Sequence, residues 1–133
     1  MKVYVATRTG RKHEARRAQD ALRALGHEIT QDWTLELPTR VTPEFAERKS
    51  VEDLDGVARA DAFILIADPG GRGMYVELGY AMALHAARGT PRIFAVGAAD
   101  VAVASIFCHH PSVVMVDSVD TAIKEIDGMG GAS

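Results

Sequence analysis

A glycine-rich segment near the middle of the chain carries the acidic residues best placed for chemistry. Residues 64–67 are apolar and predict the end of a β-strand, which Asp68 terminates, and residues 69–73 contain three glycines. A helix is predicted from Gly73, with Glu77 in its first turn. Ligands of open parallel α/β sheets bind beyond the carboxyl ends of the strands. An ionised carboxylate there is a competent nucleophile, and a helix N-terminus favours its charged form.

The glycines of this segment do not form a known nucleotide-phosphate motif. Gly71 and Gly73 match the start of a dinucleotide fingerprint, but Val76 occupies the position of the third glycine, and the segment follows the third predicted strand instead of the first. The sequence also lacks a Gly-Lys-Ser/Thr P-loop. We therefore expect no dinucleotide cofactor.

Three consecutive residues nearer the C-terminus, at positions 108–110, could also bind a metal or act as a nucleophile. His109 and His110 are adjacent and cannot both face one metal from regular structure, so we interpret them as a surface pair. Cys108 follows Phe107 and is expected to be buried instead of reactive. As the only cysteine, it excludes an internal disulfide. We expect neither a metal nor any other cofactor.

Strand and helix patterns alternate along the chain and predict a sheet that positions this segment. Strands are predicted at residues 2–6, 27–30, 61–67, 91–96 and 112–116, and helices at about 13–25, from Thr42 to beyond Ala58, at 73–87 and at 117–126. This alternation predicts an α/β, flavodoxin-like, doubly wound parallel five-stranded sheet in the order 2-1-3-4-5, with helices on both faces. The loops after strands one and three then face each other, which brings Tyr4, Arg8, Asp68 and Glu77 into one neighbourhood.

The second predicted helix carries two start signals. Thr42 and Pro43 form a good N-terminus, and the helical pattern restarts at Ser50, which makes a capping box with Asp53. After the restart the apolar stripe is expected at Val51, Leu54, Val57 and Ala58. Residues 32–41 lack periodicity and are predicted to be a loop.

Composition bounds the class of protein. The 133 residues fit a single domain over residues 1–127, followed by a flexible glycine-rich tail at 128–133. A net charge of −3 gives no support for binding to a nucleic acid, although basic residues near Arg8 leave room for a local anion site. No apolar run approaches the ~20 residues that span a bilayer. We expect a cytoplasmic protein that binds neither membrane nor nucleic acid.

Four sequence features share one register with a known family. They are Tyr4 in the first strand, Asp53-Leu54 in a helix, Ala60-Asp61 before an apolar strand, and residues 75–81 (Tyr-Val-Glu-Leu-Gly-Tyr-Ala). The chain resembles the nucleoside 2-deoxyribosyltransferase superfamily, and most closely its 2'-deoxynucleoside 5'-phosphate N-hydrolase branch. The resemblance covers about residues 2–96 and is sharpest over 53–81, where Asp53 and Glu77 match without a gap.

The resemblance implies cleavage or transfer at the N-glycosidic bond of a (2'-deoxy)nucleoside or its 5'-monophosphate. Glu77 would attack the anomeric carbon to form a covalent glycosyl-enzyme. Asp53 would hold this nucleophile or protonate the departing base, and Tyr4 would hydrogen-bond around the glutamate and the sugar. The implied partners are a small nucleoside or nucleotide and further copies of this chain, in a homodimer or higher homo-oligomer.

The resemblance also implies a set of substrate-binding residues. In place of the branch's phosphate loop the chain reads Thr-Arg-Thr-Gly-Arg, and Gly71 replaces a family serine. A second family serine, donated across a dimer interface, is best matched by Ser105. The implied substrate-binding residues are Thr7, Arg8, Thr9, Arg11, Asp68, Gly71, Gly73 and Ser105.

Other interpretations of the same residues stay open. Glu77 also fits an ordinary helix acid, Asp53 a capping residue, and Tyr4 a core residue. The altered first loop favours a non-catalytic nucleotide-binding module as an alternative function. A flavodoxin-like flavin carrier is a third hypothesis, which predicts a yellow protein.

Overall fold

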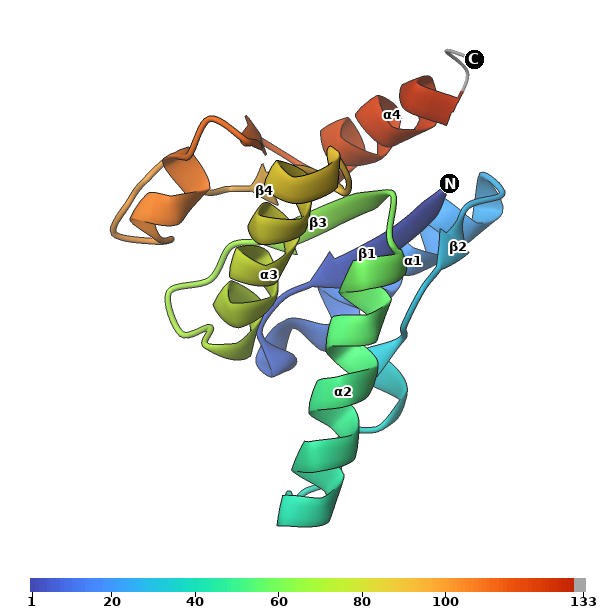
Figure 1. The fold of residues 1–133 in the computed structure, drawn as a ribbon, viewed down its shortest axis with the longest axis vertical. Coiled ribbons are helices and arrows are strands. Elements are labelled where there is room, and N and C mark those ends of the chain that lie inside the picture. The colour runs from blue at the N-terminus through green and yellow to red at the C-terminus, as the bar shows by residue number, and fades with distance from the viewer. Residues whose placement is uncertain (131–133) are drawn as a thin grey trace.

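A parallel five-stranded sheet in the order β2-β1-β3-β4-β5 forms the centre of the computed structural model, which describes residues 1–130 (Figure 1). The strands are β1 (Lys2–Ala6), β2 (Glu28–Ile29), β3 (Ala62–Ile66), β4 (Arg92–Val96) and β5 (Val113–Val116). The predicted flavodoxin-like arrangement is confirmed. Its switch point lies between β1 and β3, whose residues pair in register from Val3 with Ala62 to Ala6 with Leu65.

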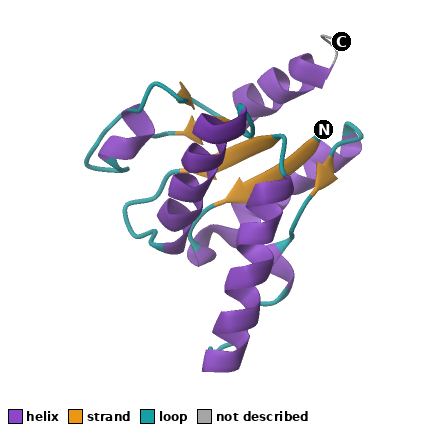
Figure 2. Ribbon diagram, viewed as in Figure 1, coloured by secondary structure: helices purple, strands orange, loops and turns teal. Residues whose placement is uncertain are grey.

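Helices cover both faces of the sheet (Figure 2). They are α1 (Lys12–Ala24), α2 (Pro43–Arg59), α3 (Gly73–Arg88) and α4 (Val119–Gly130), with short 3-10 turns η1 (Thr9–Arg11), η2 (Trp33–Leu35) and η3 (Ile106–His109). Helices α2 and α3 pack beside each other on one face, and α1 packs with α4 on the other. Within residues 1–130, no helix is both long and apolar enough to cross a membrane.

The core is centred on β1 and β3. All five residues of β3 are buried, as its unbroken apolar sequence predicts for a strand covered on both faces. Tyr4 of β1 is fully buried, and its ring stacks on Phe63 with 5.9 Å between ring centroids. Tyr4 therefore belongs to the core by its ring, whatever its hydroxyl contributes elsewhere.

Helix α2 is continuous, so the predicted restart at Ser50 is wrong. Thr42 caps the helix by accepting a hydrogen bond from the amide of Phe45 (3.1 Å), and Ser50 donates to the carbonyl of Glu47 (2.8 Å) from inside the helix. A serine that bonds back along its own helix does not break it. The expected stripe is also shifted, since Val51 is 66% exposed.

The buried residues of α2 are Lys49, Gly56 and Val57, of which the sequence predicted only Val57. A Cβ on Gly56 would come within 2.5 Å of the Gln31 Cβ and 3.1 Å of the Tyr4 ring. The glycine therefore lets α2 approach β1 closely, which brings the middle of this helix to the switch point.

The last helix is longer than predicted. Helix α4 runs to Gly130, so residues 128–130 are helical instead of part of a tail. The rest of the predicted tail, residues 131–133, lies outside the described residues. Cys108 is buried and His109 and His110 are exposed, as predicted.

Candidate active site

A cavity of about 640 Å³ opens at the switch point, within the size range of small-molecule sites. Four segments line it: the loop after β1, the η2 turn, the middle of α2, and the glycine-rich turn with the start of α3. The carboxyl ends of β1 and β3 point into this region because neighbouring parallel strands end at the same sheet edge. The loops after these two strands therefore meet, as predicted.

Tyr4 and Glu77 form a hydrogen-bonded pair in this region. The Tyr4 hydroxyl donates to Glu77 Oε2, and Glu77 lines the cavity. Burial, followed by the charges of Glu77 and Asp53, raises the pKa of Tyr4 well above its ordinary value. Tyr4 is therefore a permanently protonated donor aimed at one oxygen of Glu77.

Burial dominates the ionisation of Glu77. It raises the pKa of Glu77 to about 7; the hydrogen bond from Tyr4 opposes this rise, and the Asp53 charge adds to it. The predicted stabilisation by a helix N-terminus is wrong, because α3 begins at Gly73 and its first turn holds no acid. Glu77 lies in the second turn, beyond the effective reach of the helix dipole. At neutral pH both of its protonation states are populated.

Asp53 approaches the same cavity from α2. It is half-buried, and its Oδ1 accepts a hydrogen bond from Gln31 Nε2 (3.3 Å). Burial raises the pKa of Asp53, and the hydrogen bond from Gln31 opposes this. Since α2 is continuous, Asp53 lies well inside the helix and does not cap it. Asp53 and Glu77 are thus two carboxyl groups with raised pKa values bordering one space.

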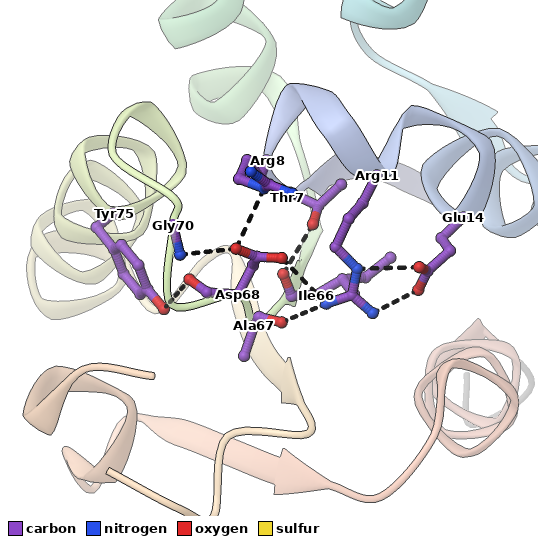
Figure 3. Close-up of polar contacts among 9 residues, drawn as sticks. All are labelled: Thr7, Arg8, Arg11, Glu14, Ile66, Ala67, Asp68, Gly70 and Tyr75. Carbon is purple, nitrogen blue, oxygen red and sulfur yellow. Dashed lines mark hydrogen bonds and ion pairs between the residues drawn. The ribbon is translucent and has the colours of Figure 1, made fainter. Parts of the chain in front are cut away.

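One end of the cavity is basic and rich in backbone amides. Arg8, Thr9 and Gly10 of the first loop line it opposite Gly70 and Arg72 of the glycine-rich turn. The Arg8 side chain is half exposed and makes an ion pair with Asp68 (Nε to Oδ1, 3.2 Å; Figure 3). Guanidinium groups and glycine-rich backbone are groups that bind anions in proteins.

Two residues predicted to bind substrate lie behind this loop instead of along the cavity (Figure 3). Arg11 binds Glu14 through two contacts (2.9 and 2.6 Å), and donates to the Ala67 carbonyl (2.5 Å). Asp68 accepts from the Gly70 amide (2.7 Å) as well as pairing with Arg8. Both residues tie the loops after β1 and β3 together.

The other predicted substrate-binding residues divide between cavity and scaffold. Thr9 and Gly73 line the cavity; Thr7 also lines it, while its hydroxyl donates to the Ile66 carbonyl (2.9 Å). Gly71 does not line it, and a Cβ there would lie 2.1 Å from the Met74 sulfur. Ser105 caps η3 by accepting from the Phe107 amide (3.2 Å), away from the cavity lining.

The cavity also contains residues that were not predicted as site residues. They are Gly10, Trp33, Ser50, Leu54, Gly70, Arg72, Met74 and Val76. Trp33 is fixed by donating from Nε1 to the Val5 carbonyl (2.7 Å). Its only signal in the sequence was a lone tryptophan in a segment without periodicity. Within residues 1–130, no group of three or more histidine, cysteine, aspartate or glutamate residues is arranged to hold a metal ion.

Comparison with known proteins gives a structural likeness and no sequence match. No protein-family model matches the chain, and no curated protein sequence does so. Among solved structures it is similar to the Clostridium botulinum CMP N-glycosidase BcmB, with a TM-score of 0.57 and 17% sequence identity. The likeness covers 96% of this chain and 98% of that chain. At this identity it shows the fold alone.

Proposed function

We propose that this protein cleaves the N-glycosidic bond of a (2'-deoxy)nucleoside or its 5'-monophosphate. The observation that carries the proposal is the Tyr4–Glu77 pair at the wall of a nucleotide-sized cavity that Asp53 also borders. The likeness to a CMP N-glycosidase along nearly the whole chain supports the same reaction class.

The two carboxyl groups have separate roles in the proposed reaction. Ionised Glu77 attacks the anomeric carbon while the carbon–nitrogen bond breaks, and the departing base takes a proton from the protonated form of Asp53, whose population the raised pKa of Asp53 increases. The product of this step is a glycosyl ester of Glu77. Water then attacks the anomeric carbon, its proton returns to Asp53, and Glu77 leaves as a carboxylate. Transfer to a second base is the same second step with a different acceptor.

Tyr4 positions the nucleophile. Its hydroxyl occupies Glu77 Oε2, which leaves Oε1 as the attacking oxygen. Donation to the carboxylate also stabilises the ionised form of Glu77, both before attack and when it departs as the leaving group. Without this bond, burial would protonate more of the nucleophile at neutral pH.

The basic end of the cavity fits a 5'-phosphate. Arg8 and Arg72 supply charge, and the backbone at Thr9 and Gly10 supplies amides. Arg8 reaches a phosphate by exchanging Asp68 for it, since the pair is partly exposed to solvent.

Base release from a panel of nucleosides and 5'-monophosphates tests the proposal. We expect at least one monophosphate to yield free base, and Glu77→Gln to lose the activity. A 2-fluoro sugar analogue is expected to add its glycosyl mass to the unsubstituted protein and not to Glu77→Gln. Turnover of no member of the panel, or activity unaffected by Glu77→Gln, refutes the proposal.

One observation favours a second candidate, a nucleotide-binding module without catalysis. Arg11 is bound to Glu14 and the Ala67 carbonyl, so the first loop offers the cavity one arginine where two were predicted. This candidate predicts thermal stabilisation by nucleotides together with no base release and no covalent adduct.

We also propose that the protein is a homodimer. Exposed apolar side chains lie on α3 (Val76, 66% exposed) and on η3 (Ile106, 66%; Phe107, 58%), next to Ser105. A second copy covering them would bring Ser105 towards a neighbouring cavity. Light scattering is expected to give twice the monomer mass, and Ile106→Asp to reduce it to the monomer mass.

A further inference from the structure

A second cavity of about 230 Å³ adjoins the first one. Thr9, Trp33 and Asp53 line both cavities, so the two spaces meet at these residues. The second cavity lies between the N-terminal half of α2 and the segment that follows η2, which run beside each other in Figure 1. Its walls are largely apolar or aromatic, with contributions from Leu37, Val41 and Phe45.

Lys49 lines this second cavity and lacks a partner. Its side chain is buried (9% exposed), on α2 one turn before Asp53. Among the residues that the structure describes, Lys49 makes no side-chain hydrogen bond and no ion pair within 4.0 Å. The stem of Lys49 is packed against the protein, while its ammonium group has no acceptor in the described part of the chain and is not among the fully buried polar atoms. Its three donors are thus available to a ligand.

The acids around Lys49 already have partners of their own. Glu36 is held by Arg48 (2.8 and 3.3 Å), Asp53 accepts from Gln31, and Glu77 accepts from Tyr4. Among the described residues that line the second cavity, Lys49 is a donor without a hydrogen-bonded acceptor, whereas Glu36 and Asp53 each already accept a hydrogen bond. Such a site favours a ligand edge that carries an acceptor.

We propose that the second cavity binds the nucleobase and that Lys49 selects bases with a carbonyl oxygen. This inference rests on the proposed N-glycosidase function and names the class of base. An ammonium group donates hydrogen bonds and accepts none, so it binds a carbonyl oxygen and leaves an exocyclic amino group at the same position unpaired. Trp33 and Phe45 offer the ring aromatic walls.

The position of Asp53 supports this placement of the base. Asp53 borders both cavities, so it lies between a base in the second cavity and a sugar beside Glu77. A general acid that protonates the leaving base has to stand at that junction. The basic end with Arg8 and Arg72 belongs to the first cavity alone, which separates phosphate from base.

Binding of free bases tests the inference without requiring turnover. Hypoxanthine and adenine are a matched pair that exchange a carbonyl oxygen for an amino group on the same ring. Trp33, the only tryptophan in the chain, reports binding through its fluorescence. We expect hypoxanthine to bind at least about tenfold more tightly than adenine, the effect of a charged hydrogen bond.

Substitution of Lys49 assigns the preference to this side chain. Lys49→Met keeps most of the volume and is expected to abolish the preference for hypoxanthine while adenine binding stays within about twofold. Lys49→Arg keeps a donor and is expected to retain part of the preference. Lys124→Met, which removes an exposed lysine from α4, is the matched control and should bind like the unsubstituted protein. Circular dichroism checks that each variant is folded.

The outcomes separate this inference from the proposed function. A preference unchanged in Lys49→Met, an equal loss for both bases, or no fluorescence response from the unsubstituted protein overturns the base site. A preference that depends on Lys49, in a protein that releases no base from any nucleotide, supports the base site and refutes the N-glycosidase. The ratio of base release from inosine monophosphate to base release from adenosine monophosphate can also be compared between Lys49→Met and the unsubstituted protein. If this ratio is the same in both, the base site is refuted and the N-glycosidase function is not.

Discussion

Replacing Tyr4 with phenylalanine isolates the hydroxyl that donates to Glu77. The Tyr4 ring is fully buried against Phe63, and phenylalanine keeps that packing. The substitution therefore removes one hydrogen bond and little else. Because that bond lowers the pKa of Glu77 against the effect of burial, its loss is expected to raise the pKa of Glu77 above about 7.

The size of the shift follows from the strength of such a bond. A hydrogen bond to a charged group contributes about 1.5–3 kcal/mol, and one pKa unit corresponds to about 1.4 kcal/mol, so the rise is roughly one to two units. The ionised fraction of Glu77 at pH 7 then falls from about one half to between about one tenth and one hundredth. We expect kcat/KM at pH 7 to fall about 5- to 50-fold from ionisation alone.

The pH profile of kcat/KM for base release measures this shift. The acidic limb is expected to move upward by roughly one to two units in Tyr4→Phe, so the deficit shrinks as the pH rises. Tyr75→Phe is the matched control, because the Tyr75 hydroxyl donates to the Asp68 carbonyl (3.3 Å) outside the cavity lining. An acidic limb that stays in place, or a deficit that is uniform across pH, refutes the assigned role of the hydroxyl.

Three further predictions concern stability and substrate binding. Burial raises the pKa of Glu77 to about 7 in the folded protein, from an ordinary value of 4.5. The stability that neutral Glu77 allows is therefore present below pH 4.5 and is lost as the pH rises through 7. Glu77→Gln should raise the free energy of unfolding at pH 8 by up to roughly 3 kcal/mol, seen as a higher Tm, and should leave Tm unchanged at pH 4. Gly56→Ala should lower the free energy of unfolding, measured by urea titration, by about 1–3 kcal/mol, because the new Cβ would lie 2.5 Å from the Gln31 Cβ. Gly128→Ala is the control, since its Cβ would meet open space, and it should show no loss of stability. Arg8→Met should raise KM for a 5'-monophosphate at least about tenfold and leave KM for the nucleoside within about twofold; equal changes for both substrates would contradict a phosphate contact.

The sheet and the central pair were predictable because they depend on patterns that the whole chain repeats. Apolar strand runs alternating with helices fix a doubly wound sheet, and its switch point requires the segments after β1 and β3 to meet. That requirement alone predicts that Tyr4 and Glu77 lie close together. The burial that raises the pKa of Glu77 was not predictable, since it depends on how closely α2 and α3 pack above the strand.

The second cavity and the position of Lys49 in it could not be predicted from the sequence, for a different reason. The path of residues 32–41 has no periodicity, and it is set by single contacts such as the Trp33 bond to the Val5 carbonyl. Arg11 illustrates the same limit on a smaller scale. A basic loop predicts an anion site, but Arg11, one of the two arginines in this loop, forms an ion pair with Glu14 three residues later.

The ion pair between Arg8 and Asp68 has a consequence for the binding of the phosphate that we propose. Asp68 holds the guanidinium of Arg8 through its Oδ1, the oxygen that also accepts from the Gly70 amide. A carboxylate of the chain itself thus contacts the guanidinium group to which we assign the phosphate. In the proposed function a phosphate has to displace Asp68 from Arg8, so we expect this exchange to favour a dianion over weakly charged metabolites.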